Sequence, residues 1–322
     1  MRLLLTGSNG FIGSRIASAA LDRGWQVIGV GRSARPTGPV SAYRRHDLTR
    51  PFDLDEAVDA VVHCAALASP WARPQQFQAN NVDATRHVVG WAQDHGSPQL
   101  VYLSSSSVLY RNADQLDLTE ESPVPCDSEQ INVYSRTKLA GERLIRAYPG
   151  PWTILRPRAV FGPGDTVLLP RLIEAARRGQ LPLFSRRDGS PVVTDLTYVD
   201  VVAQYTLTAI ERGVTGVYHL TNGQPVELYP FLFDVLDRLG QPRPTRRVPV
   251  GVAMALAGAG ETISAAFLGY REPPITRFGV SMFAYSKTFD IAACRRDLGE
   301  PPVSLAEGVQ RLVAWWGTQG RG

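Results

Sequence analysis

Short apolar runs alternate with longer amphipathic stretches over the first half of the chain. The apolar runs have the length of strands and lie at 2–6, 26–30, 60–63, 100–104 and 152–156, with a weaker one near 43–46. The amphipathic stretches have the length of helices and lie at 11–23, 75–95 and 133–147. Because strands and helices alternate, the pattern predicts an α/β fold in which right-handed βαβ units build a doubly wound parallel sheet.

The alternation weakens after Pro157. Proline, glycine and isolated aromatic residues become more frequent over 157–195 and 222–290, whereas an apolar run at 217–220 indicates a return to the sheet. We therefore expect a larger sheet domain over 1–163, to which 195–222 returns. The remaining segments, 164–194 and 223–322, are expected to form a smaller, mainly helical substrate-binding domain, and the polar residues 111–130 a loop.

Composition and charge narrow the class of protein. Hydrophobic residues make up 44% of the 322 residues, which excludes disorder as the dominant state. Lys and Arg exceed Asp and Glu by 34 − 30 = 4, and no run of five like charges occurs. A nucleic-acid partner is therefore not expected.

The cysteines bear on the compartment. Cys64, Cys126 and Cys294 are odd in number, far apart and in no C-x-x-C pair. This pattern argues against a disulfide framework and a structural metal site, and it is typical of a reducing, cytoplasmic compartment. The apolar run at 3–5 is too short for the core of a signal peptide.

A glycine-rich turn follows the first expected strand. Gly7, Gly10 and Gly13 form G-x-x-G-x-x-G between that strand and the first expected helix. Glycine allows a tight turn and a close approach of backbone N–H groups to a pyrophosphate, and the helix N-terminus adds favourable partial charge. The larger domain is therefore predicted to be a Rossmann domain that binds a dinucleotide.

The end of the second expected strand favours NADP(H) over NAD(H). A carboxylate there would bind the ribose hydroxyls of NAD, but the position holds Gly31, followed by Arg32, Ser33 and Arg35. Guanidinium groups bind a 2′-phosphate through charge-assisted hydrogen bonds. NAD(H) stays possible, and both arginines could instead be solvated loop residues. Asp47-Leu48, after the third strand, suits contact with the adenine ring.

Tyr134 and Lys138 lie four residues apart on an expected helix and so share one face. The chain has only two lysines, Lys138 and Lys287, which makes a chance match improbable. A nearby ammonium favours the phenolate, so Tyr134 is expected to exchange a proton near neutral pH. The serine run 104–107 ends the fifth strand, at the sheet edge where ligands bind in such folds.

With these motifs the chain resembles the extended short-chain dehydrogenase/reductase superfamily along almost its whole length. The matching pieces are 6–13, 47–48, 63–66, 81–82, the serine run, Y-x-x-x-K at 134–138, 155–157 and 161–165. The resemblance implies that Tyr134 is the general acid/base and that Lys138 binds the nicotinamide ribose and lowers the pKa of the tyrosine. It implies a homodimer formed by the helices near 75–95 and 133–147.

The same resemblance implies the other site residues. Alignment on the tyrosine-containing stretch 108–110 favours Ser106 as the catalytic hydroxyl, with Ser105 as second choice, and Asn81 matches a position near the catalytic centre. The implied cofactor-binding residues are Gly7, Asn9, Gly10, Phe11, Ile12, Gly13, Arg32, Ser33, Arg35, Asp47, Leu48, Ala65, Ala66, Leu67, Ser104, Tyr134, Lys138, Pro157, Arg158 and Val160. The implied substrate-binding residues are Ser106, Ser107, Trp71 and Ala159.

Two branches of the superfamily compete for the substrate class. Nucleotide-sugar epimerases and dehydratases commonly have an asparagine where this chain has Ala159 and an acidic residue where it has Gly31. The stretches 168–179, 195–200, 273–278 and 285–291 instead resemble the branch of 3β-hydroxysteroid dehydrogenases, sterol-4-carboxylate dehydrogenases and 2-alkyl-3-oxoalkanoate reductases. We therefore expect NADP(H)-dependent interconversion of a secondary alcohol and a ketone on a lipophilic substrate. A nucleotide-sugar epimerase/dehydratase and a non-catalytic NADP(H)-binding sensor are the alternatives.

The segment 248–270 carries one charge in 23 residues. It could line an apolar pocket, act as a lid, contact a membrane surface or form a buried helix. Its longest uncharged stretch, 248–260, is too short to span a bilayer, so no transmembrane segment is expected. Trp71, Phe267, Tyr270 and Phe283 are expected in a pocket or in the core.

Overall fold

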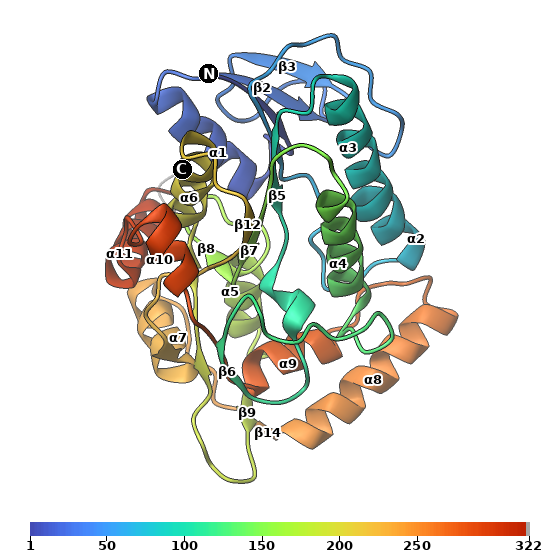
Figure 1. The fold of residues 1–322 in the computed structure, drawn as a ribbon. Coiled ribbons are helices and arrows are strands. Elements are labelled where there is room, and N and C mark those ends of the chain that lie inside the picture. Colours follow the sequence, from blue (N-terminus) through green and yellow to red (C-terminus); the bar gives the residue numbers. More distant parts are fainter. Residues whose placement is uncertain (320–322) are drawn as a thin grey trace.

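A computed structural model describes residues 1–319 and has a seven-stranded parallel sheet at its centre (Figure 1). The strand order is β12-β7-β5-β4-β1-β2-β3. The strands are β1 (Arg2–Thr6), β2 (Gln26–Gly31), β3 (Ala42–Arg45), β4 (Ala60–His63), β5 (Gln99–Leu103), β7 (Trp152–Pro157) and β12 (Gly216–Leu220). The predicted α/β doubly wound fold is confirmed.

Helices cover both faces of this sheet. They are α1 (Phe11–Asp22) and α6 (Val199–Glu211) on one side and α3 (Ala84–Asp94) and α4 (Val133–Arg146) on the other (Figure 1). Successive strand residues point to opposite faces, so Leu3 and Leu5 belong to the core cluster on the α1 side, whereas Leu4 belongs to the cluster on the α3 side. Burial on both faces explains why the strands are apolar throughout.

The predicted helix over 75–95 is interrupted. It consists of α2 (Pro74–Phe77), a π-helical turn η1 (Gln78–Asp83) and α3. The wider turn carries Asn81, whose side chain is buried. Such turns are frequent at functional sites, and hydrophobic spacing does not reveal them.

The second part of the molecule contains more strand than its sequence pattern predicted. A four-stranded sheet has the order β13 (Val226–Glu227), β10 (Val193–Thr194), β15 (Lys287–Phe289) and β6 (Gln115–Leu118). Two pairs complete the strands, β8 (Val160–Phe161) with β11 (Thr197–Tyr198) and β9 (Leu183–Ser185) with β14 (Arg247–Pro249). Because β6 lies in 111–130, the expectation of a loop there was wrong: a distant partner, β15, provides its hydrogen bonds.

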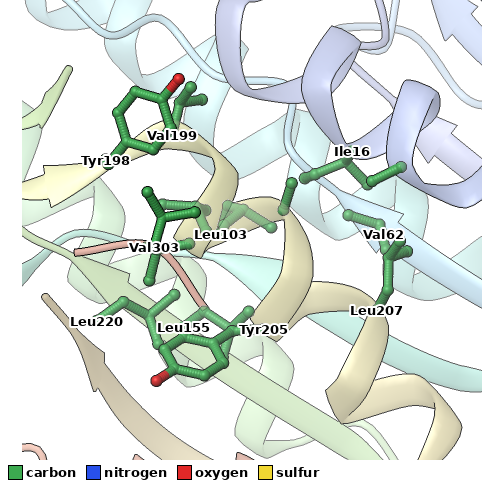
Figure 2. Packing of buried hydrophobic residues seen from close by; sticks show 14 of the residues in the cluster. Ile16, Val62, Leu103, Leu155, Tyr198, Val199, Tyr205, Leu207, Leu220 and Val303 are labelled. Carbon is green, nitrogen blue, oxygen red and sulfur yellow. The ribbon is translucent and has the colours of Figure 1, made fainter. Parts of the chain in front are cut away.

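The helices of this part are α5 (Leu169–Arg177), α7 (Leu228–Arg238), α8 (Val250–Phe267) and α9 (Arg277–Ala284). The C-terminal helices α10 (Ala292–Leu298) and α11 (Leu305–Gln319) lie elsewhere, against the main sheet domain. Figure 2 shows Val303, between these two helices, in the same core cluster as Leu155 and Leu220. These C-terminal residues, which the sequence analysis assigned to the smaller domain, therefore pack against the core of the main sheet.

Candidate active site

The glycine loop joins β1 to α1 in a conformation that requires glycine. Gly7 has a positive φ of 72°, and a Cβ atom there would lie 2.8 Å from the Ala65 backbone nitrogen. A Cβ atom on Gly13 would lie 2.1 Å from the Gly7 carbonyl oxygen. No side chain caps α1, whose N-cap residue is Gly10, so the first N–H groups of this helix have no side-chain acceptor. This arrangement fits the pyrophosphate of a dinucleotide.

A cavity of about 470 Å³ opens beside this loop. Its walls include most of the residues that the sequence predicted for the cofactor: Gly7, Asn9, Gly10, Phe11, Ile12, Gly13, Arg32, Ser33, Asp47, Leu48, Ala65 and Ala66. The cavity also contains Asn80 and Thr166, which the sequence analysis missed because they come from the η1 turn and from a loop of the second half. The predicted residues from four separate segments therefore meet at one site.

The end of β2 determines the charge at one end of this cavity. Arg32 and Ser33 are exposed and line the cavity, and no carboxylate occupies the strand end at Gly31. Asn9 organises the loop beyond them, since its amide donates to the Arg35 carbonyl oxygen at 3.2 Å and accepts from the Thr37 N–H at 3.0 Å. Arg35 is exposed and, unlike Arg32, does not line the cavity.

Asp47 lies at the predicted adenine side of the cavity. Its Oδ1 accepts hydrogen bonds from the Thr49 N–H at 3.1 Å and the Thr49 hydroxyl at 3.0 Å. Hydrogen bonding by the Thr49 backbone is the largest influence on the pKa of Asp47, which is lowered, and nearby Arg32 acts in the same direction. The carboxylate is therefore ionised at neutral pH and can accept from an exocyclic amine.

Tyr134 and Lys138 do not line this cavity but lie next to its wall at Cys64. The thiol of Cys64 lines the cavity and is near enough to both side chains to influence their pKa values electrostatically. Burial lowers the pKa of Lys138 to about 8, and its Nζ donates to the Leu103 carbonyl oxygen at 2.5 Å and lies 4.2 Å from the Tyr102 ring centroid.

The predicted lowering of the tyrosine pKa does not occur in this structure. Burial raises the pKa of Tyr134 to about 12, and hydrogen bonding with Ser105 only partly opposes this effect. The reason is that desolvation disfavours the charged phenolate more than the hydrogen bonding with Ser105 favours it. Tyr134 is thus a protonated phenol at neutral pH.

The four serines after β5 have different partners. Ser105 contacts Tyr134, whereas the Ser106 hydroxyl is buried and hydrogen-bonded to the Tyr110 hydroxyl at 2.8 Å. The Ser107 hydroxyl is buried and bonds to that of Ser105 at 2.9 Å. Of the two candidate serines, Ser105 is therefore near enough to Tyr134 to affect its pKa, whereas the Ser106 hydroxyl bonds to Tyr110. Ser106 begins a short 3-10 turn, η2 (Ser106–Leu109).

Ser104 does not face the predicted cofactor site. Its buried hydroxyl donates to Glu142 on α4 at 2.5 Å. The same carboxylate accepts two hydrogen bonds from Arg156, at 2.8 and 2.6 Å, and both charged side chains are 1% exposed. Sequence analysis missed this bidentate ion pair, although Glu142 lies four residues after Lys138 on the same helical face. It fixes the serine segment, α4 and β7 to one another.

Asn81 holds two parts of the site together. Its Oδ1 accepts from the Leu67 N–H at 2.7 Å, and its Nδ2 donates to the Thr137 hydroxyl at 3.1 Å. The side chain is 1% exposed. These contacts make Asn81 a positioning residue for α4 and for the loop after β4, because its amide is already engaged on both sides. Leu67 bonds to Asn81 through its backbone N–H, and it does not line the cavity.

The residues at the end of β7 and just after it, 157–160, pair with neighbouring strands or point into the protein. Pro157 and Val160 pair within strands, with Leu220 and Thr197 respectively, and do not line the cavity. The Arg158 guanidinium is buried, donates to the Thr194 hydroxyl at 2.9 Å and does not line the cavity. Ala159 adopts a positive φ of 41°, which turns the chain between the two strands.

Trp71 contacts α8. Its indole N–H donates to the Ser264 hydroxyl at 3.2 Å, and its ring stacks on Tyr270 with centroids 5.8 Å apart. Phe267, expected in a pocket or in the core, is 82% exposed and occupies neither.

Within the described residues 1–319, no group of three or more metal-ligating side chains occurs.

Comparison with known proteins identifies relatives over the whole chain. A model described as the NAD-dependent epimerase/dehydratase family matches residues 3–220. A protein of Stenotrophomonas maltophilia named 2-alkyl-3-oxoalkanoate reductase is 32% identical, over 98% of this chain and 99% of its own length. The decarboxylating sterol-4-alpha-carboxylate 3-dehydrogenase of Homo sapiens is 30% identical, over 78% of this chain and 70% of its own length. Both relatives belong to the groups that the second half of the sequence resembles.

A solved structure of MoeE5 in complex with UDP-glucuronic acid and NAD is similar in fold. It has a TM-score of 0.74 and 22% identity, and the match covers 99% of this chain and 100% of the other. At this identity the likeness supports the fold and not the substrate.

Proposed function

The chain belongs to the NAD-dependent epimerase/dehydratase family, and from this premise we propose that it is an NADP(H)-dependent oxidoreductase that interconverts a ketone and a secondary alcohol on a lipophilic substrate. The observation that carries the proposal is the pair Tyr134 and Lys138, four residues apart on α4 and both beside Cys64, which lines the dinucleotide cavity. A proton donor there suits the reduction of a carbonyl group.

When bound, the reduced nicotinamide supplies the hydride that the carbonyl carbon accepts. Tyr134 donates its hydroxyl proton to the carbonyl oxygen, which becomes the hydroxyl of the product alcohol and stays bonded to the same carbon. The Ser105 hydroxyl donates a hydrogen bond to the same oxygen and stabilises negative charge that develops on it. Lys138, charged below about pH 8, stabilises the phenolate that remains on Tyr134. The reverse sequence oxidises the alcohol.

Substitutions of the tyrosine and of the serines test these roles. Replacing Tyr134 with Phe should lower turnover by about 10²- to 10⁴-fold while NADPH binding is retained, and Tyr148→Phe, outside the site, should leave turnover unchanged. Retained turnover in Tyr134→Phe would refute the assignment of the proton donor. Ser105→Ala should lower turnover more than Ser106→Ala, because only Ser105 contacts the tyrosine; the reverse order would restore Ser106 to that role.

Arg32 supports the choice of NADP(H). It is exposed and lines the cavity where a family member specific for NAD would carry a carboxylate. Arg32→Asp should therefore lower the preference for NADPH over NADH by about 10- to 100-fold, the value of a charge-assisted hydrogen bond. Arg35→Asp provides the matched control, since Arg35 does not line the cavity. An unchanged preference in Arg32→Asp would remove the basis for choosing NADP(H).

The names of the relatives support a lipophilic substrate. One is named for 2-alkyl-3-oxoalkanoates and another for sterol-4-carboxylates. Oxidation of NADPH at 340 nm should therefore be seen with a long-chain 2-alkyl-3-ketoacid or a 3-ketosteroid. Activity with a UDP-sugar 4-ketone alone would replace this proposal by the epimerase alternative, and NADPH binding without any turnover would replace it by the sensor.

The proposal also covers the cellular compartment and the oligomeric state of the enzyme. Cys64, Cys126 and Cys294 are all free thiols, which supports a reducing, cytoplasmic compartment. Helices α3 and α4 pack side by side and supply the surface for a homodimer. Light scattering on the purified chain should give twice the mass of 35.2 kDa, and a monomer at micromolar concentration would contradict this part of the proposal.

A further inference from the structure

Helix α8 presents an apolar face to the outside of the molecule. Its four large exposed residues are Val252, Leu256, Ile263 and Phe267, which are 51%, 59%, 50% and 82% exposed. At 3.6 residues per turn these positions fall within an arc of about 60° around the helix. The neighbouring Leu268, just past the helix end, is 56% exposed. The large exposed side chains therefore form one continuous stripe along the full length of α8.

The opposite face of α8 attaches it to the protein. Ala253, Ala257, Glu261 and Ser264 are buried. Glu261 accepts hydrogen bonds from the Arg277 backbone N–H and from its side chain, each at 2.7 Å. The preceding strand β14 pairs with β9, and α9 packs against α8. Because the helix is held firmly by this side, the exposure of its apolar stripe is a property of the folded state.

By length and composition alone α8 could cross a membrane. Its 18 residues extend for about 27 Å at 1.5 Å per residue. However, both ends continue into paired or packed elements of the same domain, and the buried side carries an ion pair with α9. Pulling α8 into the bilayer core would break these contacts, so the geometry is that of a helix that lies on a surface.

Positive charge flanks the apolar stripe at both ends. Arg246 and Arg247 precede α8, and Arg271 follows it; all three side chains are exposed. Among residues 1–319, none of the three has an ion-pair partner. The single acidic residue of α8, Glu261, is buried and neutralised by Arg277. The stripe is therefore bordered by unpaired cations, with no exposed anion on the helix itself.

We propose that α8 binds the surface of a bilayer that contains anionic phospholipids. The apolar stripe inserts among the acyl chains near the headgroups, while the flanking arginines bind the phosphates. An apolar surface bordered by cations complements an anionic bilayer, whereas a second copy of this chain would bring the same arginines together. The helix lies at the edge of the molecule, away from the main sheet (Figure 1), so a flat surface can reach it.

The docked helix would lie next to the proposed active site. Its C-terminal end contacts the loop after β4 through Trp71 and through Arg73, whose guanidinium donates to the Gly269 carbonyl oxygen at 3.2 Å. The same loop begins at Ala65 and Ala66, which line the dinucleotide cavity. One loop therefore joins the buried side of α8 to a wall of the dinucleotide cavity. The bilayer proposal does not depend on the proposed reaction, because binding is measured without turnover.

The test is sedimentation of the full chain with vesicles. Phosphatidylcholine vesicles are compared with vesicles in which roughly one lipid in three is phosphatidylglycerol. We expect binding to the anionic vesicles that is at least about tenfold stronger and that weakens with added salt. Failure to bind either kind of vesicle would overturn the proposal, as would equal binding to both.

Variants then assign binding to α8. Leu256→Glu/Phe267→Glu should weaken binding by at least about 100-fold, because two apolar anchors are lost, whereas Phe267→Leu should retain binding. Arg246→Glu/Arg247→Glu should weaken it by at least about 25-fold, roughly fivefold for each cation. The matched control, Arg295→Glu/Arg296→Glu, changes two exposed arginines on α10, on the other side of the molecule.

Circular dichroism checks that each variant is folded. Equal loss in the α10 control would show that overall charge and not α8 governs binding, and it would overturn the proposal. A different result would assign the stripe to an interface with a second copy of the chain. In that case the wild type would not bind vesicles, and Leu256→Glu/Phe267→Glu would lower the mass measured by light scattering.

Discussion

A buried histidine should make this protein less stable as the pH falls from 7 to 5. His219, at the β12 end of the main sheet, is 1% exposed and packs on Phe289 with ring centroids 5.0 Å apart. Burial, assisted by the Arg156 guanidinium, lowers the pKa of His219 to about 4 from its ordinary 6.5. The unfolded chain therefore takes up a proton at this position between pH 6.5 and 4, whereas the folded chain does not.

The sign and size of the effect follow from linkage. A group that binds more protons in the unfolded state gives stability that is complete above pH 6.5 and declines as the pH falls toward 4. One pKa unit corresponds to about 1.4 kcal/mol. At pH 5 the unfolded histidine is favoured by about 1.5 units, so His219 alone should lower the free energy of unfolding by about 2 kcal/mol relative to pH 7.

The assay is urea unfolding of the wild type and of His219→Leu at pH 7 and pH 5. Leucine is apolar and of similar size, and the ring nitrogens have no hydrogen-bond partner among residues 1–319 that it would leave unpaired. The variant should lose about 2 kcal/mol less than the wild type between the two pH values. His95→Leu controls for the removal of a histidine as such. An identical pH dependence in wild type and His219→Leu would refute the reasoning.

Further predictions concern the loop, the ion pair and the lysine. Gly13→Ala should weaken NADPH binding by about tenfold or more, because the added Cβ atom would lie 2.1 Å from a carbonyl oxygen of the loop. Gly90→Ala is the control, since its Cβ atom would meet no atom within 4 Å and NADPH binding should not change. Titration of NADPH fluorescence measures the affinity of both variants. Arg156→Met should lower the free energy of unfolding by about 3–5 kcal/mol, because Glu142 is left charged and buried, and a loss under about 1 kcal/mol in urea would contradict this. Turnover in the reduction direction should fall as the pH rises through about 8, where Lys138 loses its charge, and Lys138→Arg should move that fall upward; a pH–rate profile that does not move would exclude Lys138 as its cause.

The sequence by itself determined the main sheet and the dinucleotide cavity. Leu3, Leu4 and Leu5 form an apolar run of strand length, and the glycines at 7, 10 and 13 favour a tight turn into a helix. These signals are local, since each depends on residues within one turn or one strand. They predicted the parallel order of elements, and the family resemblance that they carry implied most of the residues that line the cavity.

Tertiary structure alone decided how the polar groups of the site are used. The four adjacent serines are indistinguishable in sequence, yet Ser104 bonds to Glu142 and Ser106 to Tyr110, which leaves Ser105 for Tyr134. These partners come from elements distant along the chain. The pKa of Tyr134 also depends on burial, which no spacing between residues reports.

The same distinction explains α8. Its composition allowed a buried helix, a pocket wall, a lid or a membrane contact, because nearly all of its residues are apolar. Only the docking of Ala253, Ala257 and Glu261 against the protein determined which side is covered and left Phe267 outside. The apolar sequence of α8 favours removing its side chains from water. Packing against distant parts of the chain determines which of these side chains the fold buries and which stay exposed.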